Sequence, residues 1–159
     1  MSKLPAVFMR GGTSKALIFL ERDLPADREE WASLFLRAIG SPDPYGRQLN
    51  GMGGGISSLS KVCIIGKPSR SDADVDYTFA QLLPRESIVD YSGNCGNMSS
   101  AIGPFAIDEG LVKAADGEVT VRIHNTVGAE IERSDGTWTA KRGAFYRTAR
   151  RLFDGFVYV

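Results

Sequence analysis

The sequence has little cysteine and histidine, and it has no excess of charge of either sign. Two cysteines, Cys63 and Cys95, are too few for a disulfide framework in 159 residues, and a single histidine removes most zinc-site patterns. Nineteen basic side chains match nineteen acidic ones, so net charge gives no argument for a nucleic acid or an anionic membrane as partner. Any anion binding must therefore be local.

Long apolar runs are also absent. No stretch approaches the length of a membrane span, and the first eight residues lack the basic-then-apolar layout of a signal peptide. We therefore expect a protein of the reducing cytoplasm with no membrane partner. The hydrophobic content of 43% is enough for one good core or two small ones.

The spacing of apolar residues predicts a mixed order of strands and helices. Helices are predicted from about Asp27 to Ile39, where Gly40 follows, and from Met98 to Asp108. Runs rich in β-branched and aromatic residues predict strands at 6–9, 16–20, 62–65, 75–83 and 118–126, with a shorter run at 87–89. This order predicts the α+β class, with a mixed, largely antiparallel sheet around a helix.

The chain is organised around residues 90–103, which read as a strand end, a glycine turn and the start of a small-residue helix. The first amides of a helix have no backbone partner and favour negative charge. Cys95 falls at this end. A thiol at such a position is a candidate proton donor or acceptor near neutral pH. The alternative is that Cys95 only fills space beside a turn.

A second polar turn, at residues 10–15, separates the first two predicted strands. It holds two cations, two hydroxyls and two glycines, which suits a carboxylate or a phosphate. It is not a P-loop, because the glycine, lysine and hydroxyl spacing differs and no helix start follows. The alternative is a Gly-Gly hairpin with solvated Arg10 and Lys15.

Lys61 lies at the entrance of the buried-type strand 62–65. A lysine that loses water there can act as a general base, and one that faces a carboxylate stays charged and binds it. The alternative is a strand-end lysine that extends to solvent. Cys63 alternates with apolar residues and is assigned to the core. The only imidazole, His124, is assigned to a solvent or cross-strand position.

Residues 41–55 form a long segment rich in proline and glycine. Loops of this length in compact domains are usually functional or disordered. Tyr45, Leu49 and Met52 are the side chains that we expect to hold this loop in place.

Several of these motifs together carry a resemblance. They are residues 9–15 (MRGGTSK), 40–46 (GSPDPYG), 51–54 (GMGG), 57–62 (SSLSKV) and 92–97 (SGNCGN). In this order the sequence resembles the PrpF family of 2-methylaconitate and 3-methylitaconate isomerases and oxalomesaconate tautomerases. The resemblance implies a diaminopimelate epimerase-like fold, in which two similar halves, each a sheet around a helix, enclose the active site. It also implies an isomerase that moves a C=C bond in an unsaturated di- or tricarboxylate without a cofactor or a metal.

The implied reaction needs a base at the allylic carbon and hydrogen-bond donors where the dienolate charge develops. The resemblance makes Lys61 and Cys95 the candidates for proton transfer, with base and acid unassigned between them. The candidates for binding the substrate carboxylates are Arg10, Thr13, Ser14, Asn94, Gly96 and Asn97. An amino-acid epimerase is disfavoured, because Cys63 is a poor candidate for the second cysteine that such an enzyme would be expected to need.

The resemblance extends from about residue 6 to residue 126. We therefore expect residues 1–126 to form the N-terminal half of such an isomerase, and residues 127–159 to be a divergent tail, with the second half absent. The run 147–151 is expected to pack poorly. A homodimer would hide apolar surface that the second half should cover. The alternative function is a non-catalytic domain that has kept only the carboxylate site.

Overall fold

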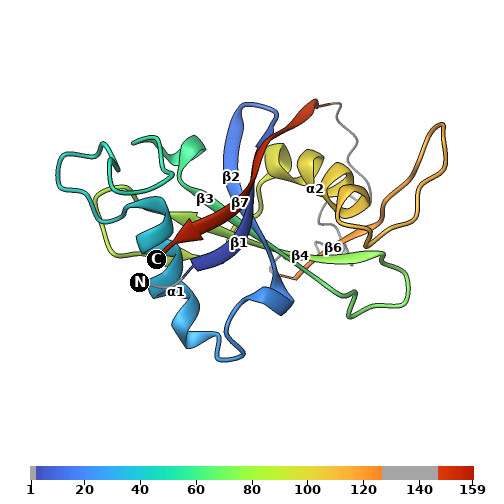
Figure 1. Cartoon of the computed structure of the whole chain (residues 1–159), viewed down its shortest axis with the longest axis horizontal. Helices are drawn as coiled ribbons and strands as arrows, with labels where there is room; N and C mark the ends of the chain where they lie inside the picture. Colours follow the sequence, from blue (N-terminus) through green and yellow to red (C-terminus); the bar gives the residue numbers. More distant parts are fainter. Residues whose placement is uncertain (1–2, 127–146) are drawn as a thin grey trace, which may run out of the picture.

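The computed structural model describes residues 3–126 and 147–159. Within them one sheet has the strand order β5-β4-β3-β2-β1-β7 (Figure 1), and β6 also pairs with β4. The strands are β1 Lys3–Gly11, β2 Ser14–Leu20, β3 Lys61–Gly66, β4 Val75–Leu82, β5 Val89–Asp90, β6 Ile123–Asn125 and β7 Ala149–Tyr158. The β2–β3 and β4–β6 pairs are parallel, and the other pairs are antiparallel. The α+β class and the mixed sheet are confirmed.

Each face of the sheet carries one long helix, α1 Glu29–Ile39 or α2 Gly96–Asp108 (Figure 1). Side chains alternate between the two faces of a strand. In β3, Val62 and Ile64 join the core under α1, whereas Cys63 and Ile65 join the core under α2. The sheet is therefore the middle layer of three, and the prediction that Cys63 is a core residue is confirmed.

The first helix forms as its sequence predicts. The Asp27 carboxylate accepts a hydrogen bond from the Glu29 amide at 2.9 Å, which partners one of the free N–H groups at the helix start. Trp31 and Phe35 are among the buried residues that face the sheet. Gly40 adopts a left-handed φ of 82° and ends the helix.

The loop 41–55 is ordered, but not by the side chains that we expected. Tyr45 and Leu49 are each 77% exposed, so the prediction that they hold the loop is wrong; Met52 does pack against the α1-side core. Gln48, which is buried, holds the loop instead. Its side-chain nitrogen donates to the Ser41 hydroxyl at 2.8 Å, and its oxygen accepts from the Ser60 hydroxyl at 2.8 Å. Two backbone bonds also tie the loop to the end of α1, from the Met52 and Gly53 amides to the Ala38 and Ile39 carbonyls at 2.8 and 3.0 Å.

The strand expected over 118–126 is shorter than predicted, because only residues 123–125 pair with β4. Just before them, the Asp74 carboxylate accepts from both the backbone amide and the guanidinium of Arg122, at 2.7 and 2.8 Å. His124 lies opposite Asp76, and its Nδ1 is 2.9 Å from the Asp76 carboxylate. The cross-strand position of His124 is confirmed.

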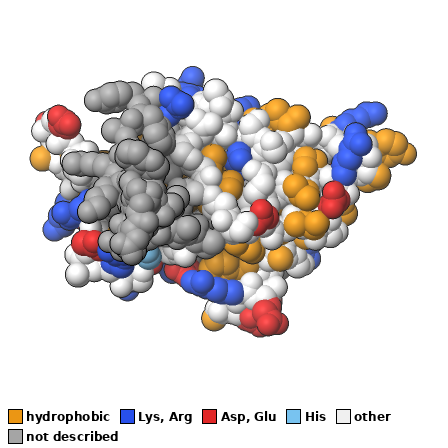
Figure 2. Space-filling view, turned by 180° about the vertical axis from the view of Figure 1, so that it is seen from behind, with side chains coloured by type: hydrophobic (Ala, Val, Ile, Leu, Met, Phe, Trp, Pro, Cys, Tyr) orange, Lys and Arg blue, Asp and Glu red, His pale blue; other side chains and the backbone are white. Residues whose placement is uncertain are grey.

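Residues 149–158 form the edge strand β7. The expectation that the run 147–151 packs poorly is therefore wrong for residues 149–151, which pair with β1. The strand pairs with β1 from Gly11↔Ala149 to Lys3↔Tyr158. The large hydrophobic side chains of β7 that remain more than two-fifths exposed are Leu152, Phe153, Phe156 and Tyr158. Figure 2, which views the molecule from the side opposite to Figure 1, shows further hydrophobic side chains at several places outside the grey atoms. The rest of the predicted tail, residues 127–146, lies outside the described residues.

Candidate functional site

The start of α2 matches the prediction made for residues 90–103. Cys95 is the N-cap residue, with an extended backbone (φ −122°, ψ 98°), and the helix begins at Gly96. The Cys95 carbonyl accepts from the amide and the hydroxyl of Ser99, at 2.9 and 3.1 Å. The amides of Gly96 and Asn97 lie in the first turn, where no preceding turn supplies an acceptor. Cys95 is half-buried against the α2-side core and stands at the positive end of the helix dipole.

The turn between β1 and β2 lies directly against this helix start. Gly11 pairs with Ser14, so the turn itself consists of Gly12 and Thr13, and Gly12 has a φ of 51°. A Cβ on Gly11 would overlap the backbone carbonyl of Asn97, which explains why glycine is needed here. The Asn97 side-chain amide donates to the Thr13 hydroxyl at 3.1 Å. Two motifs that lie far apart in the sequence therefore form one site.

Arg10 braces this turn. Its guanidinium donates to the Gly12 carbonyl at 2.8 Å, and to the carbonyl and the hydroxyl of Thr148 at 3.1 Å each. Arg147 donates from Nε to the Asn97 side-chain oxygen at 3.3 Å. Arg147 and Thr148 were not among the predicted site residues, because they lie outside every motif and reach the site only through the pairing of β7 with β1.

Lys61 begins β3 at the same end of the sheet and on the same face as α2. Its side chain is 7% exposed, so the alternative of a solvated strand-end lysine is wrong. The Lys61 ammonium lies 4.9 Å from the centroid of the Phe79 ring and donates to the Gln81 side-chain oxygen at 2.6 Å. Phe79 also approaches Gly93, where a Cβ would lie 3.9 Å from the ring. Phe79 therefore separates Lys61 from the turn that leads to Cys95.

Beneath these groups lies Cys63. Burial raises the pKa of the Cys63 thiol to about 12, and a hydrogen bond with the Tyr77 hydroxyl only partly opposes this effect. Cys95 and Lys61 are close enough to influence the Cys63 thiol electrostatically, with opposite signs. A thiol that stays protonated at neutral pH cannot act as a base. This leaves Cys95 as the cysteine available for chemistry.

The remaining candidates differ in exposure. Ser14 is buried at the end of the turn, whereas Asn94 is exposed just before Cys95. Thr13 is bonded to Asn97, and Arg10 is bonded to the Gly12 carbonyl of the same turn, so these residues form one cluster. Lys61 and Cys95 stand on the same face, beside that cluster. Among the described residues, no group of three or more His, Cys, Asp and Glu side chains is placed to hold a metal ion.

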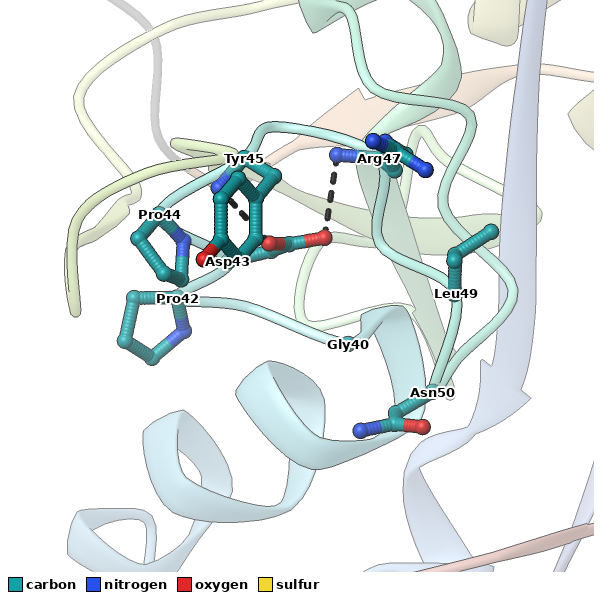
Figure 3. A pocket seen from close by; sticks show the side chains of 8 residues that line it. All are labelled: Gly40, Pro42, Asp43, Pro44, Tyr45, Arg47, Leu49 and Asn50. Atoms are coloured by element: carbon teal, nitrogen blue, oxygen red, sulfur yellow. Dashed lines mark hydrogen bonds between the residues drawn. The ribbon is translucent and has the colours of Figure 1, made fainter.

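A separate surface pocket of about 440 Å³ lies over the loop that follows α1 (Figure 3). Its lining includes Pro42, Tyr45 and Arg47, and none of the candidate residues above. Asp43 organises it by accepting hydrogen bonds from the amides of Tyr45, Arg47 and Gln48 at 2.9, 3.0 and 2.6 Å. These bonds, led by that from Tyr45, hold the pKa of the Asp43 carboxyl below its ordinary value.

No described helix is both long enough and apolar enough to span a membrane.

Comparison with known proteins gives a consistent result. A family model described as PrpF protein matches residues 1–134. The 3-methylitaconate isomerase of Eubacterium barkeri is 49% identical over 139 residues, which cover 84% of this chain and 36% of that protein. The 2-methyl-aconitate isomerase of Cupriavidus necator is 50% identical over 129 residues, which cover 76% and 33%. A crystal structure of methylitaconate-delta-isomerase matches with a TM-score of 0.75 and 50% identity, over 79% of this chain and 32% of that one. The chain thus spans about a third of the length of these relatives.

Proposed function

Because the chain belongs to the PrpF family, we propose that it carries part of the site of a cofactor-independent isomerase. The reaction would move a carbon–carbon double bond in an unsaturated di- or tricarboxylate of the 2-methylaconitate, 3-methylitaconate or 4-oxalomesaconate type. Relatives named as isomerases of methylitaconate and methyl-aconitate support this substrate class. The two free thiols, Cys63 and Cys95, suit a reducing compartment such as the cytoplasm.

The observation that carries the proposal is the contact between the β1–β2 turn and the start of α2. Removing an allylic proton leaves a dienolate, whose charge spreads onto a carboxylate of the substrate. Donors that are already fixed in place stabilise such a charge without reorganising. The amides of Gly96 and Asn97, with the hydroxyls of Thr13 and Ser14, are the donors that this contact gathers. Arg10 supplies positive charge beside them, and the exposed Asn94 extends the row of polar groups.

Lys61 and Cys95 are the proposed proton-transfer groups. One takes the proton from the allylic carbon, and the other returns a proton to the carbon at the far end of the three-carbon system. Both stand on the α2 face of the sheet, with the Phe79 ring beside Lys61 and the helix start beside Cys95. A substrate with a carboxylate on the helix amides would lie beside Cys95, on the face of the sheet that also carries Lys61.

The test is deuterium exchange followed by proton NMR. The chain is incubated with 3-methylitaconate in D2O, and loss of the allylic proton signals reports proton abstraction. In parallel, amide spectra with cis-aconitate report binding at Gly11, Gly12, Gly93 and Gly96. We expect exchange by the chain as given, and no exchange by Lys61→Ala with an otherwise unchanged amide spectrum.

The outcomes separate two functions. Exchange supports the isomerase. Shifts at the four glycines without exchange support a non-catalytic domain that binds carboxylates. An absence of both results, from a chain with a dispersed amide spectrum, would overturn the proposal. Normal exchange by Lys61→Ala would remove Lys61 from the mechanism.

A further inference from the structure

The side-chain carboxamide of Gln81 holds the Lys61 side chain in place. Gln81 lies on β4, directly across from Lys61 in the register of the β3–β4 pair. Its side-chain oxygen accepts from the Lys61 ammonium at 2.6 Å. Its side-chain nitrogen donates to the backbone carbonyls of Ser57 and Ser60 at 3.0 Å each, and to that of Leu82 at 3.1 Å. The carboxamide is therefore engaged at both ends.

Chemistry alone fixes the orientation of this carboxamide. The three carbonyl oxygens can only accept hydrogen bonds, so the NH2 group of Gln81 must face them. A lysine side chain offers donors, so the oxygen of Gln81 must face Lys61. Rotating the amide by 180° would place oxygen against carbonyl oxygens and donors against the ammonium. Gln81 thus presents one acceptor at one fixed point.

Ser60, one of the residues whose carbonyls bind Gln81, is itself fixed by hydrogen bonds. The Ser60 carbonyl also accepts from the Leu82 amide at 3.0 Å, and the Ser60 hydroxyl is bonded to the buried Gln48. Gln48 in turn anchors the loop 41–55 through Ser41. A chain of hydrogen bonds therefore runs from this loop through Gln48, Ser60 and Gln81 to the Lys61 ammonium.

We propose that Gln81 is a positioning residue for Lys61, an assignment that rests on the function proposed above. It keeps the ammonium on the α2 face of the sheet, beside the Phe79 ring. A neutral acceptor suits this task, because both an ammonium and a neutral amine can donate one hydrogen to it. The remaining hydrogens of the ammonium, or the lone pair of the amine, are then directed away from Gln81. A carboxylate at this position would instead hold the lysine as an ammonium by a close ion pair.

Two variants separate positioning from general damage to the fold. Gln81→Met keeps the length of the side chain and removes the acceptor, whereas Gln81→Glu keeps an acceptor and adds a negative charge. Asn50→Asp is the control for charge, since Asn50 is exposed on the loop of Figure 3 and lines that pocket. Backbone amide spectra of the three variants establish that the fold is intact.

The first readout does not depend on activity. A lysine Nζ group that is hydrogen-bonded and shielded exchanges its hydrogens slowly with water, so Lys61 should give its own Nζ–H correlation in a nitrogen-15 spectrum. We assign this signal by its loss in Lys61→Met. We expect it to be absent from Gln81→Met and present in Gln81→Glu and Asn50→Asp. A signal unchanged in Gln81→Met would overturn the positioning role, whatever the activity of the chain.

The second readout is the exchange rate of 3-methylitaconate protons. We expect kcat to fall on the order of 100-fold in Gln81→Met, the size of effect that a displaced catalytic group produces, with little change in KM. The kcat of Gln81→Glu should fall by a similar factor, although the Nζ signal of Lys61 persists. If the unaltered chain shows the Nζ signal and no exchange, the isomerase proposal fails and the Nζ result alone decides the role of Gln81. Full exchange activity in both variants would refute the proposal.

Discussion

Asn97, in the first turn of α2, donates its side-chain amide to the hydroxyl of Thr13 in the β1–β2 turn, across 3.1 Å. This bond joins residues that are 84 positions apart in the sequence. The same contact brings the Asn97 carbonyl against Gly11, so backbone and side chain both fix the turn on the helix. Four predictions follow from this contact and from the buried groups beside it.

The first concerns the energy of the Thr13–Asn97 bond. Thr13→Val and Asn97→Ala should each lower the free energy of unfolding by about 1 kcal/mol, the usual net contribution of one hydrogen bond. The double variant should lose less than the sum, because both changes remove the same bond. Urea unfolding of the four proteins measures this coupling. Strictly additive losses of stability would show that the bond contributes nothing. Thr120→Val, at an exposed threonine, is the control.

The second prediction compares two glycines. Gly11→Ala should destabilise the chain by about 1–3 kcal/mol, since its Cβ would overlap the Asn97 carbonyl and press on Met98. Gly103→Ala should change stability by less than about 1 kcal/mol. Its Cβ would meet Val121 at an ordinary 3.8 Å, and the helix propensity of alanine is offset by the ring of the following Pro104. Thermal unfolding of the two variants and the unaltered chain measures both effects. Equal effects of the two changes would contradict the close approach at Gly11.

The third prediction distinguishes the two thiols. Cys95 is half-buried at a helix start, whereas Cys63 is fully buried and its pKa is raised to about 12. Iodoacetamide at pH 8 should therefore modify Cys95 in the folded chain, and should reach Cys63 only after unfolding. Mass spectrometry of digested protein locates the label. Cys95→Ala should take up no label while folded, and Cys63→Ala should be labelled like the unaltered chain.

The fourth prediction concerns alkaline pH. Burial raises the pKa of Cys63 from 9.0 to about 12 and that of Tyr77 above its ordinary value. In the unfolded chain both groups ionise near their ordinary values, so ionisation favours the unfolded state as pH rises past about 9. Stability is thus full below pH 9 and is lost progressively between pH 9 and 12. For Cys63 alone the loss is at most about 4 kcal/mol.

Chemical denaturation at intervals between pH 8 and 11 measures this loss. The curve should be flatter for Cys63→Ala than for the unaltered chain, and flatter again when Tyr77→Phe is added. Parallel curves for all three proteins would mean that neither buried group contributes to the pH dependence. The comparison uses slopes, because each substitution also changes stability at neutral pH by altering the packing.

Local signals in the sequence were sufficient for much of this fold. Gly40 predicted the end of α1, since a helix that stops in a left-handed conformation prefers glycine. The glycines around Cys95 predicted the turn into α2, and Cys95 is indeed the N-cap residue. The strand predicted at 75–83 is β4, whose Val75, Tyr77 and Phe79 lie in the core on one face. In each case the information lies within a few residues of the feature that it determines.

Other features depend on partners that are distant in the sequence, and these were missed. Arg10 bonds to Thr148, 138 positions away, and no motif marks Thr148. In the sequence, Gln81 is one more polar residue in an alternating strand. Only the register of β3 and β4 shows that it lies across from Lys61. Tyr45 and Leu49 resembled apolar anchors, yet the loop 41–55 is held by the polar Gln48. Side-chain type alone does not reveal which group a fold will bury.

The pairing of β7 with β1 also has a kinetic consequence. Lys3 lies opposite Tyr158, so this pair closes a loop that contains almost the whole chain. Closing a loop of that length costs roughly 4–5 kcal/mol of chain entropy, and contacts of large sequence separation form slowly. The local hairpin of β1 and β2 can form without waiting for it. We therefore expect Arg10 to acquire its bonds to Thr148 late in folding, when the last strand joins the sheet.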